Sequence, residues 1–179
     1  VRVKAEAGEP EGYVVVAASQ EKGKGRVGRS FFSPADTGVY MSILLRPEGL
    51  SPGEASKITT MAAVAVCQAI EALSGRQAQI KWVNDIYMDG KKVSGILTEA
   101  SVGLEDGLLD YGILGIGMNV YIPADGFPDE LSGKAGAIFE SPQDDGKNRL
   151  AAEVLNRFMK ACRTKESSAY VEEYRKRCL

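Results

Sequence analysis

The sequence predicts an α+β fold with a mixed, largely antiparallel central sheet flanked by helices. Short runs rich in β-branched residues are joined mostly by hairpin-length turns, which is the pattern of antiparallel strands. A long apolar segment with helix-capping signals and two further helical segments accompany these runs. No internal repeat or long linker divides the 179 residues, so we expect a single domain.

Five short runs of mainly aliphatic and β-branched residues are predicted to be strands. They are Tyr13–Ser19, Val39–Leu45, Ile80–Met88, Val93–Ala100 and Tyr111–Val120. Asp89-Gly90 is a hairpin turn signal between the third and fourth runs. The glycines of Gly103–Gly107 predict another turn between the fourth and fifth.

The long helix is predicted to begin at Ser51, which forms a capping box with Glu54. It should run to about Leu73, because Gly75 suits the position just beyond a helix end. Its middle is apolar on nearly all sides, so we expect it to be buried. After a loop rich in Gly, Pro and Asp, two more helices are predicted at Asn148–Cys162 and Ser167–Arg177.

The composition excludes several classes of function. With 22 Lys and Arg against 24 Asp and Glu, the net charge of −2 argues against a chain-wide nucleic-acid surface. No apolar run is long enough to span a membrane, and the first residues lack a signal-peptide core. Cys67, Cys162 and Cys178 are widely spaced, so we predict no zinc site or disulfide framework and a cytoplasmic setting. The absence of His excludes Ser-His and Cys-His catalysis within this chain.

The segment Gly23–Gly28, G-K-G-R-V-G, matches the dinucleotide-binding fingerprint literally. That fingerprint must open a helix, but turn signals follow these glycines, so we reject the Rossmann interpretation. A P-loop is also rejected, since no G-K-[ST] follows. The glycines still let backbone N–H groups approach an anion, and Arg26 and Arg29 offer planar forks for phosphate. Taken alone, the loop fits either phosphate binding or a solvated charged surface, and it is the sole support for a nucleic-acid role.

A second polar cluster interrupts the apolar run that follows Ile80. Lys81, Asn84 and Asp85 lie within that run, and Lys92 comes just after the hairpin turn. Side chains at the ends of two paired strands can share one rim of a sheet. We therefore expect these residues to lie close together.

Together, four stretches resemble the catalytic domain of biotin–protein ligases. K-G-K-G-R-V-G-R-S-F-F-S-P is similar to the family loop G-R-G-R-x-G-R-x-[WF]-x-S-P, and V-Y-M-S-I-L-L-R-P to L-Y-x-S-x-x-L-R-P. K-W-V-N-D-I-Y-M-D-G-K-K-V-S-G-I-L-T-E is similar to K-W-P-N-D-[IL]-Y-x-x-x-K-[KL]-x-G-I-L-x-E, and G-I-G-M-N-V to G-[IA]-G-[IL]-N-[VL]. They occur in family order and spacing, from about Gly8 to Leu179. Four matched motifs are far more specific than one.

The resemblance implies a fold related to class II aminoacyl-tRNA synthetases and a two-step ligase reaction. Biotin and ATP with Mg²⁺ would give biotinyl-5′-AMP, and the biotinyl group would pass to a lysine of a biotin carboxyl carrier protein domain. It implies no nucleic-acid or membrane partner for this chain, and a possible homodimer. Lipoate–protein ligase and a non-catalytic biotin- or adenylate-binding module are the alternatives.

The same resemblance assigns the site. Lys92 and Arg26 would be catalytic, with Lys92 near the biotin carboxylate and the α-phosphate. The biotin- and adenylate-binding residues would be Gln20, Gly23, Lys24, Gly25, Arg26, Arg29, Trp82, Asn84, Lys92, Gly95 and Asn119. No metal site formed by the protein is implied.

The chain departs from the family pattern at a few positions. No S-T-N motif precedes the first helix, Val83 stands in place of the motif's Pro, and Lys24 in place of its Arg. Lysine keeps the charge of arginine but loses its bidentate fork. We expect residues 1–179 to be the catalytic domain truncated at its N-terminal strand, without a helix-turn-helix or an SH3-like C-terminal domain.

Overall fold

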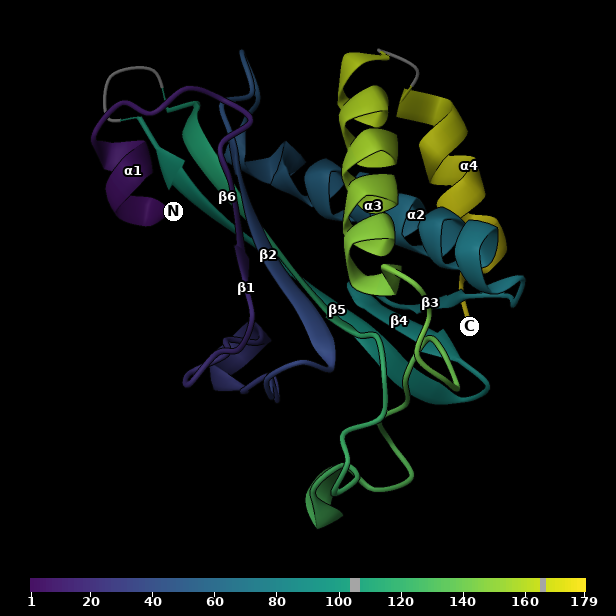
Figure 1. The fold of residues 1–179 in the computed structure, drawn as a ribbon. Helices are drawn as coiled ribbons and strands as arrows, with labels where there is room; N and C mark the ends of the chain where they lie inside the picture. The colour runs from purple at the N-terminus through teal and green to yellow at the C-terminus, as the bar shows by residue number, and fades with distance from the viewer. Residues whose placement is uncertain (104–106, 165–166) are drawn as a thin grey trace.

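A computed structural model of the chain describes residues 1–103, 107–164 and 167–179. Its named strands form one sheet in the order β1-β2-β6-β5-β4-β3 (Figure 1). The strands are β1 (Val14–Ala17), β2 (Gly38–Leu45), β3 (Gln79–Lys81), β4 (Asp85–Met88), β5 (Lys91–Val102) and β6 (Leu109–Asn119). Every neighbouring pair of these strands is antiparallel. Parallel pairing in the described residues is confined to the isolated bridges Ile80–Cys178 and Lys92–Ala135. The predicted α+β class is therefore confirmed.

The helices pack mainly on one face of the sheet. They are α1 (Arg2–Glu6), α2 (Ala55–Ser74), α3 (Gly146–Arg163) and α4 (Ser167–Arg177), with short 3₁₀ turns η1 (Arg26–Gly28), η2 (Pro52–Glu54) and η3 (Asp129–Leu131). Figure 1 shows α2, α3 and α4 together on one side, while α1 lies apart from them near β1 and β6. The opposite face is left open beyond α1.

The core lies between the sheet and α2. Alternate residues of β2, including Met41 and Ile43, point toward the helices and are buried with the Ala- and Val-rich middle of α2. The predicted capping box between Ser51 and Glu54 is present, but its first turn is 3₁₀, so α2 itself begins at Ala55. Gly75 adopts the left-handed conformation at the end of the helix, with φ 67°.

The prediction of one strand over Ile80–Met88 is wrong. The segment forms two short antiparallel strands, β3 and β4, joined by a turn over Trp82–Asn84. Ile80 and Ile86 are directly paired and both fully buried, so the apolar pattern of one long strand also fits a hairpin. The polar residue Asn84 marks the turn and not a strand interior.

The other predicted elements are confirmed, with small shifts at their ends. Asp89 and Gly90 form the predicted hairpin turn with φ 47° and 74°. The turn predicted over Gly103–Gly107 contains residues 104–106, which lie outside the described residues. Within the described chain, no helix is long and apolar enough to cross a membrane.

Candidate active site

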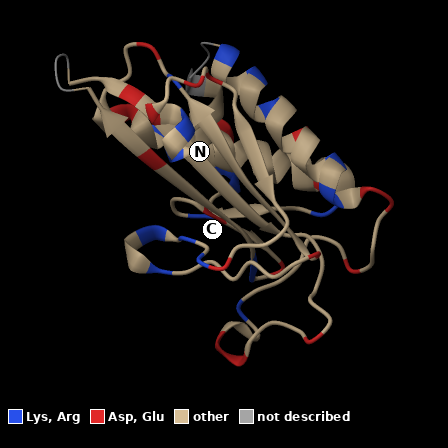
Figure 2. Ribbon diagram, turned by 60° about the vertical axis from the view of Figure 1, so that its left-hand side comes forward, with Lys and Arg blue, Asp and Glu red and all other residues tan. Residues whose placement is uncertain are grey.

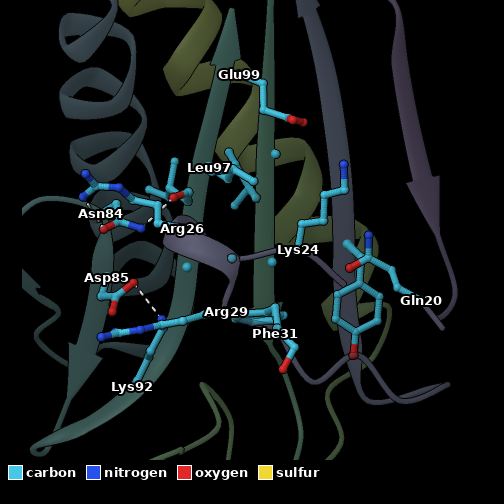
Figure 3. A pocket seen from close by; sticks show the side chains of 18 of the residues that line it. Gln20, Lys24, Arg26, Arg29, Phe31, Asn84, Asp85, Lys92, Leu97 and Glu99 are labelled. Atoms are coloured by element: carbon cyan, nitrogen blue, oxygen red, sulfur yellow. Dashed lines mark hydrogen bonds and ion pairs between the residues drawn. The ribbon is translucent and has the colours of Figure 1, made fainter. Parts of the chain in front are cut away.

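The open face of the sheet carries a cavity of about 660 Å³ (Figure 3). Its floor is formed by β2, β5 and β6, and its walls by the loop over residues 20–31 and the turn Trp82–Asn84. Nine of the eleven residues predicted from the sequence line it: Gln20, Lys24, Gly25, Arg26, Arg29, Trp82, Asn84, Lys92 and Gly95. Two regions far apart in the sequence, residues 20–29 and 82–95, therefore meet at one cavity.

One part of the cavity floor is formed by glycines. Gly95 of β5 and Gly117 of β6 are directly paired, and the ring of Phe31 lies over them. A Cβ atom at Gly117 would lie 2.6 Å from a ring carbon of Phe31, and one at Gly95 would lie 3.2 Å from it. Glycine is therefore required here for close approach of a flat group. The sequence motif contained Phe31, but its role as a cover of the floor was not predicted.

Lys92 lines the cavity and forms an ion pair there. Its ammonium Nζ is 2.7 Å from Oδ1 of Asp85 and 5.9 Å from the centre of the Phe31 ring. A β-bulge shifts the register of β4 and β5 so that Lys92 pairs with Tyr87, on the same face as Asp85. Asp85 was predicted to lie on this rim, but it was not among the predicted site residues. Predicting this ion pair would require the register between β4 and β5, which the sequence does not give.

The basic glycine loop is a closed, locally hydrogen-bonded turn. The N–H of Phe31 donates to the carbonyl of Gly23 at 2.9 Å, and the N–H of Gly25 donates to the carbonyl of Arg29 at 2.7 Å. A Cβ atom at Gly23 would lie 2.3 Å from the Phe31 carbonyl oxygen, so this position needs glycine. The glycines do not lead into a longer helix, as predicted, because the next named element after the three-residue η1 is the strand β2. Figure 2 shows Lys and Arg gathered on this loop.

Asn84 connects the loop to the sheet. Nη1 of Arg26 donates to Oδ1 of Asn84 at 3.4 Å (Figure 3). The amide Nδ2 of Asn84 donates to the carbonyl of Ile96 at 2.8 Å, and the N–H of Ile96 donates to the carbonyl of Asn84 at 2.9 Å. The side chain of Asn84 is therefore fixed on β5 and presents its oxygen to the loop.

Two residues predicted for the site do not line the cavity. Gly23 is buried in the base of the loop. The amide of Asn119 donates to the carbonyl of Gly136 at 3.1 Å, and the N–H of Gly136 donates to the carbonyl of Lys92 at 2.9 Å. Asn119 thus supports the chain segment that pairs with Lys92.

The cavity is strongly positive in the described part of the chain. Lys and Arg supply six of its lining residues, namely Lys22, Lys24, Arg26, Arg29, Lys81 and Lys92, against the carboxylates Asp85 and Glu99. Both carboxylates are paired, Asp85 with Lys92 and Glu99 with Arg2 at 3.1 Å. Burial raises the pKa of Tyr40, whose hydroxyl donates to the carbonyl of Pro34. The remaining positive charge suits anionic ligands such as phosphates and carboxylates.

Residues 5–119 match the model of the biotin/lipoate A/B protein ligase family. Bifunctional ligase/repressor BirA from Bacillus spizizenii is 44% identical over 132 residues, which cover 74% of this chain and 40% of that protein. Biotin–[acetyl-CoA-carboxylase] ligase from Paracoccus denitrificans is 36% identical over 125 residues, covering 69% and 49%. A solved structure of the biotin protein ligase from Aquifex aeolicus in complex with biotin and ATP has a TM-score of 0.82 at 26% identity, covering 99% of this chain and 73% of that one.

The fold and the site define an α+β domain with a positively charged cavity that includes Lys92. The chain belongs to the biotin/lipoate A/B protein ligase family. It spans about 40% of the length of the BirA relative and 49% of the Paracoccus relative.

Proposed function

We propose that this chain is the catalytic domain of an ATP-dependent biotin–protein ligase. It activates biotin to biotinyl-5′-AMP and transfers the biotinyl group to a lysine of a biotin carboxyl carrier protein domain. The observation that carries the proposal is the Lys92–Asp85 pair beside a glycine floor, enclosed by a basic loop. The relatives named above are biotin ligases, which favours biotin over lipoate as the substrate.

In the first step, an oxygen of the biotin carboxylate attacks the α-phosphorus of ATP. A carbonyl–oxygen–phosphorus bond forms, the bond from the α-phosphorus to the bridging oxygen breaks, and pyrophosphate leaves with the electron pair. The reaction brings anions together, so its barrier falls when fixed cations face them. Lys92, paired with Asp85, lines the cavity together with Arg26 and Arg29 of the basic loop. One such group is worth about 3 kcal/mol of transition-state stabilisation.

In the second step, the neutral amine of the acceptor lysine attacks the acyl carbon of biotinyl-5′-AMP. An amide bond forms, the bond from the acyl carbon to the phosphate oxygen breaks, AMP leaves with the electron pair, and the proton of the amine passes to solvent. No nucleophile of the protein is needed, which fits a cavity lined by cations, amides and backbone.

Mg²⁺ enters this proposal bound to ATP. No group of three or more His, Cys, Asp or Glu suited to hold a metal occurs among the described residues, and the two cavity carboxylates are already paired with cations. This donor set fits an ion carried by the phosphates better than one held by the protein. Carried by ATP, the ion would neutralise part of the phosphate charge. The residues of the chain would then hold the biotin carboxylate and the α-phosphate.

We place this activity in the cytoplasm. Cys67, Cys162 and Cys178 are all free thiols. Unpaired cysteines are typical of a reducing compartment. The carrier proteins that we propose as acceptors would be encountered there.

The decisive experiment measures biotinyl-5′-AMP formation by this chain alone, with radiolabelled ATP and either biotin or lipoate. We expect adenylate with biotin and none with lipoate. Adenylate with lipoate alone would replace the proposal with a lipoate–protein ligase. Biotin binding by calorimetry with no adenylate would identify a non-catalytic binding module instead.

A further inference from the structure

The turn Trp82–Asn84, which forms one wall of the cavity, is contacted by the last helix, α4. The hydroxyl of Tyr174 in α4 donates to the carbonyl oxygen of Val83 at 2.9 Å, across 91 positions of sequence. The Tyr174 ring also meets the ring of Trp82 edge-on, with centroids 6.1 Å apart. Tyr174 is 4% exposed, whereas Trp82 is 77% exposed. A buried group therefore fixes an exposed turn.

Helix α4 is itself anchored on α2. The guanidinium of Arg177 pairs with Glu71 of α2 at 2.5 Å and with Glu173 at 2.8 Å, and its side chain is 15% exposed. Glu71 also accepts a hydrogen bond from the N–H of Ala78, next to β3. A support that is locked by packing and ion pairs can hold a site residue in one geometry.

The position of the turn decides where Asn84 meets the loop. Asn84 follows Val83 directly, is bonded to Ile96 of β5, and accepts from Arg26. Loss of the Tyr174 hydroxyl would leave the Val83 carbonyl without that donor, so the turn would be held less rigidly, mainly by the bonds between Asn84 and Ile96. Arg26 would then lose the fixed oxygen that it contacts.

We infer that Tyr174 is a positioning residue for ATP binding, holding the turn Trp82–Asn84 so that Asn84 receives Arg26 when the loop covers the cavity. The inference rests on the proposed ligase function. Tyr174 lies beyond residues 5–119, the part of the chain that matches the family model. Burial raises the pKa of Tyr174 to about 12, so the hydroxyl stays a neutral donor at physiological pH.

The test compares Tyr174→Phe, which removes the hydroxyl and keeps the ring, with Tyr170→Phe. Tyr170 lies in the same helix and packs on the core, and its hydroxyl has no hydrogen-bond partner among the described residues. We expect Tyr174→Phe to raise the KM for ATP in biotin-dependent ATP–pyrophosphate exchange about three- to tenfold, as loss of one hydrogen bond predicts. The KM for biotin should stay within about twofold of the wild type. Tyr170→Phe should change neither KM.

Trp82 supplies a readout that does not depend on activity, because it is the single Trp of the chain. We expect the acrylamide quenching constant of Trp82 fluorescence to differ from the wild-type value in Tyr174→Phe and to equal it in Tyr170→Phe. A wild-type KM for ATP in Tyr174→Phe overturns the inference, whether or not quenching changes. If the wild type shows no exchange, the proposed function fails; ATP affinity by calorimetry then decides the positioning role. A three- to tenfold weaker affinity in Tyr174→Phe supports it, and equal affinity or no binding overturns it.

Discussion

The side chain of Lys92 is about one-third exposed, and its ammonium pairs with Asp85 at 2.7 Å, so its removal costs little stability. In the proposed reaction, however, it faces the developing charge on the α-phosphate. We expect Lys92→Ala to slow biotin-dependent pyrophosphate exchange at least about 100-fold, which corresponds to loss of about 3 kcal/mol. Lys91→Ala is the matched control, because Lys91 is exposed and does not line the cavity. Exchange at the wild-type rate in Lys92→Ala would refute the role.

Gly117 is a second residue at which the addition of one carbon atom should disturb the site. Because an added Cβ would lie 2.6 Å from the Phe31 ring, Gly117→Ala must push that ring and the loop behind it off the floor. We expect a loss of about 1–3 kcal/mol in the free energy of unfolding, together with weaker biotin binding. Gly112→Ala in the same strand is the control, since its nearest contact would be an ordinary 3.8 Å. Urea unfolding and calorimetry measure both effects, and equal results for the two variants would contradict the assignment.

Among the elements, the basic loop is tied to the rest of the site by Arg26. Its guanidinium donates a hydrogen bond to the side chain of Asn84 at 3.4 Å. The backbone hydrogen bonds of the loop, by contrast, stay within residues 20–33. We expect Arg26→Gly to release biotinyl-5′-AMP several-fold faster, because the loop loses its link to the turn and a cation over the phosphate. Glu21→Ala, an exposed change in the same loop outside the cavity, should leave release unchanged. A filter-binding chase measures the release rate, and unchanged release in Arg26→Gly would argue against closure of the loop.

The elements that could be predicted from the sequence are those decided by neighbours in the chain. The Ser51–Glu54 capping box, the Asp89-Gly90 turn and Gly75 at a helix end depend on residues a few positions apart. The pairing of β3 with β4 does not, because a strand and a tight hairpin bury Ile80 and Ile86 alike. The polar residue Asn84 was the available signal for the turn, and it was assigned to a strand.

The same distinction, between contacts near in the sequence and contacts far apart in it, explains which site residues could be predicted. Motif residues such as Arg26, Asn84 and Lys92 could be named from local patterns, and the structure places all three on the cavity. The partners that orient them depend on the tertiary fold. The Asp85–Lys92 pair depends on a bulge in the strand register, and the contact from Tyr174 to Val83 joins positions 91 apart. No periodicity or spacing within one segment reports such contacts.

At the scale of the whole molecule, the sheet separates two environments. One face is buried under α2, α3 and α4, and the other carries the charged cavity, so groups needed for stability and for chemistry lie on opposite sides. Cys67 and Tyr174 are among the titratable groups on the helix side. Burial raises the pKa of Cys67 to about 12, and it also raises the pKa of Tyr174 to about 12.

These two groups make the folded state sensitive to alkali. Their ordinary pKa values are 9.0 and 10.0, so between about pH 9 and 12 the folded chain keeps protons that the unfolded chain has lost. Their contribution to stability is therefore complete below pH 9 and is lost as the pH rises toward 12. Each group contributes a slope of up to about 1.4 kcal/mol per pH unit in the free energy of unfolding. Urea unfolding at pH 8, 9.5 and 10.5 should show this decline. Cys67→Ala should remove the contribution of Cys67, so that the free energy of unfolding falls less steeply with pH. An equal slope in that variant, or a free energy of unfolding that does not change with pH in the wild type, would contradict the prediction.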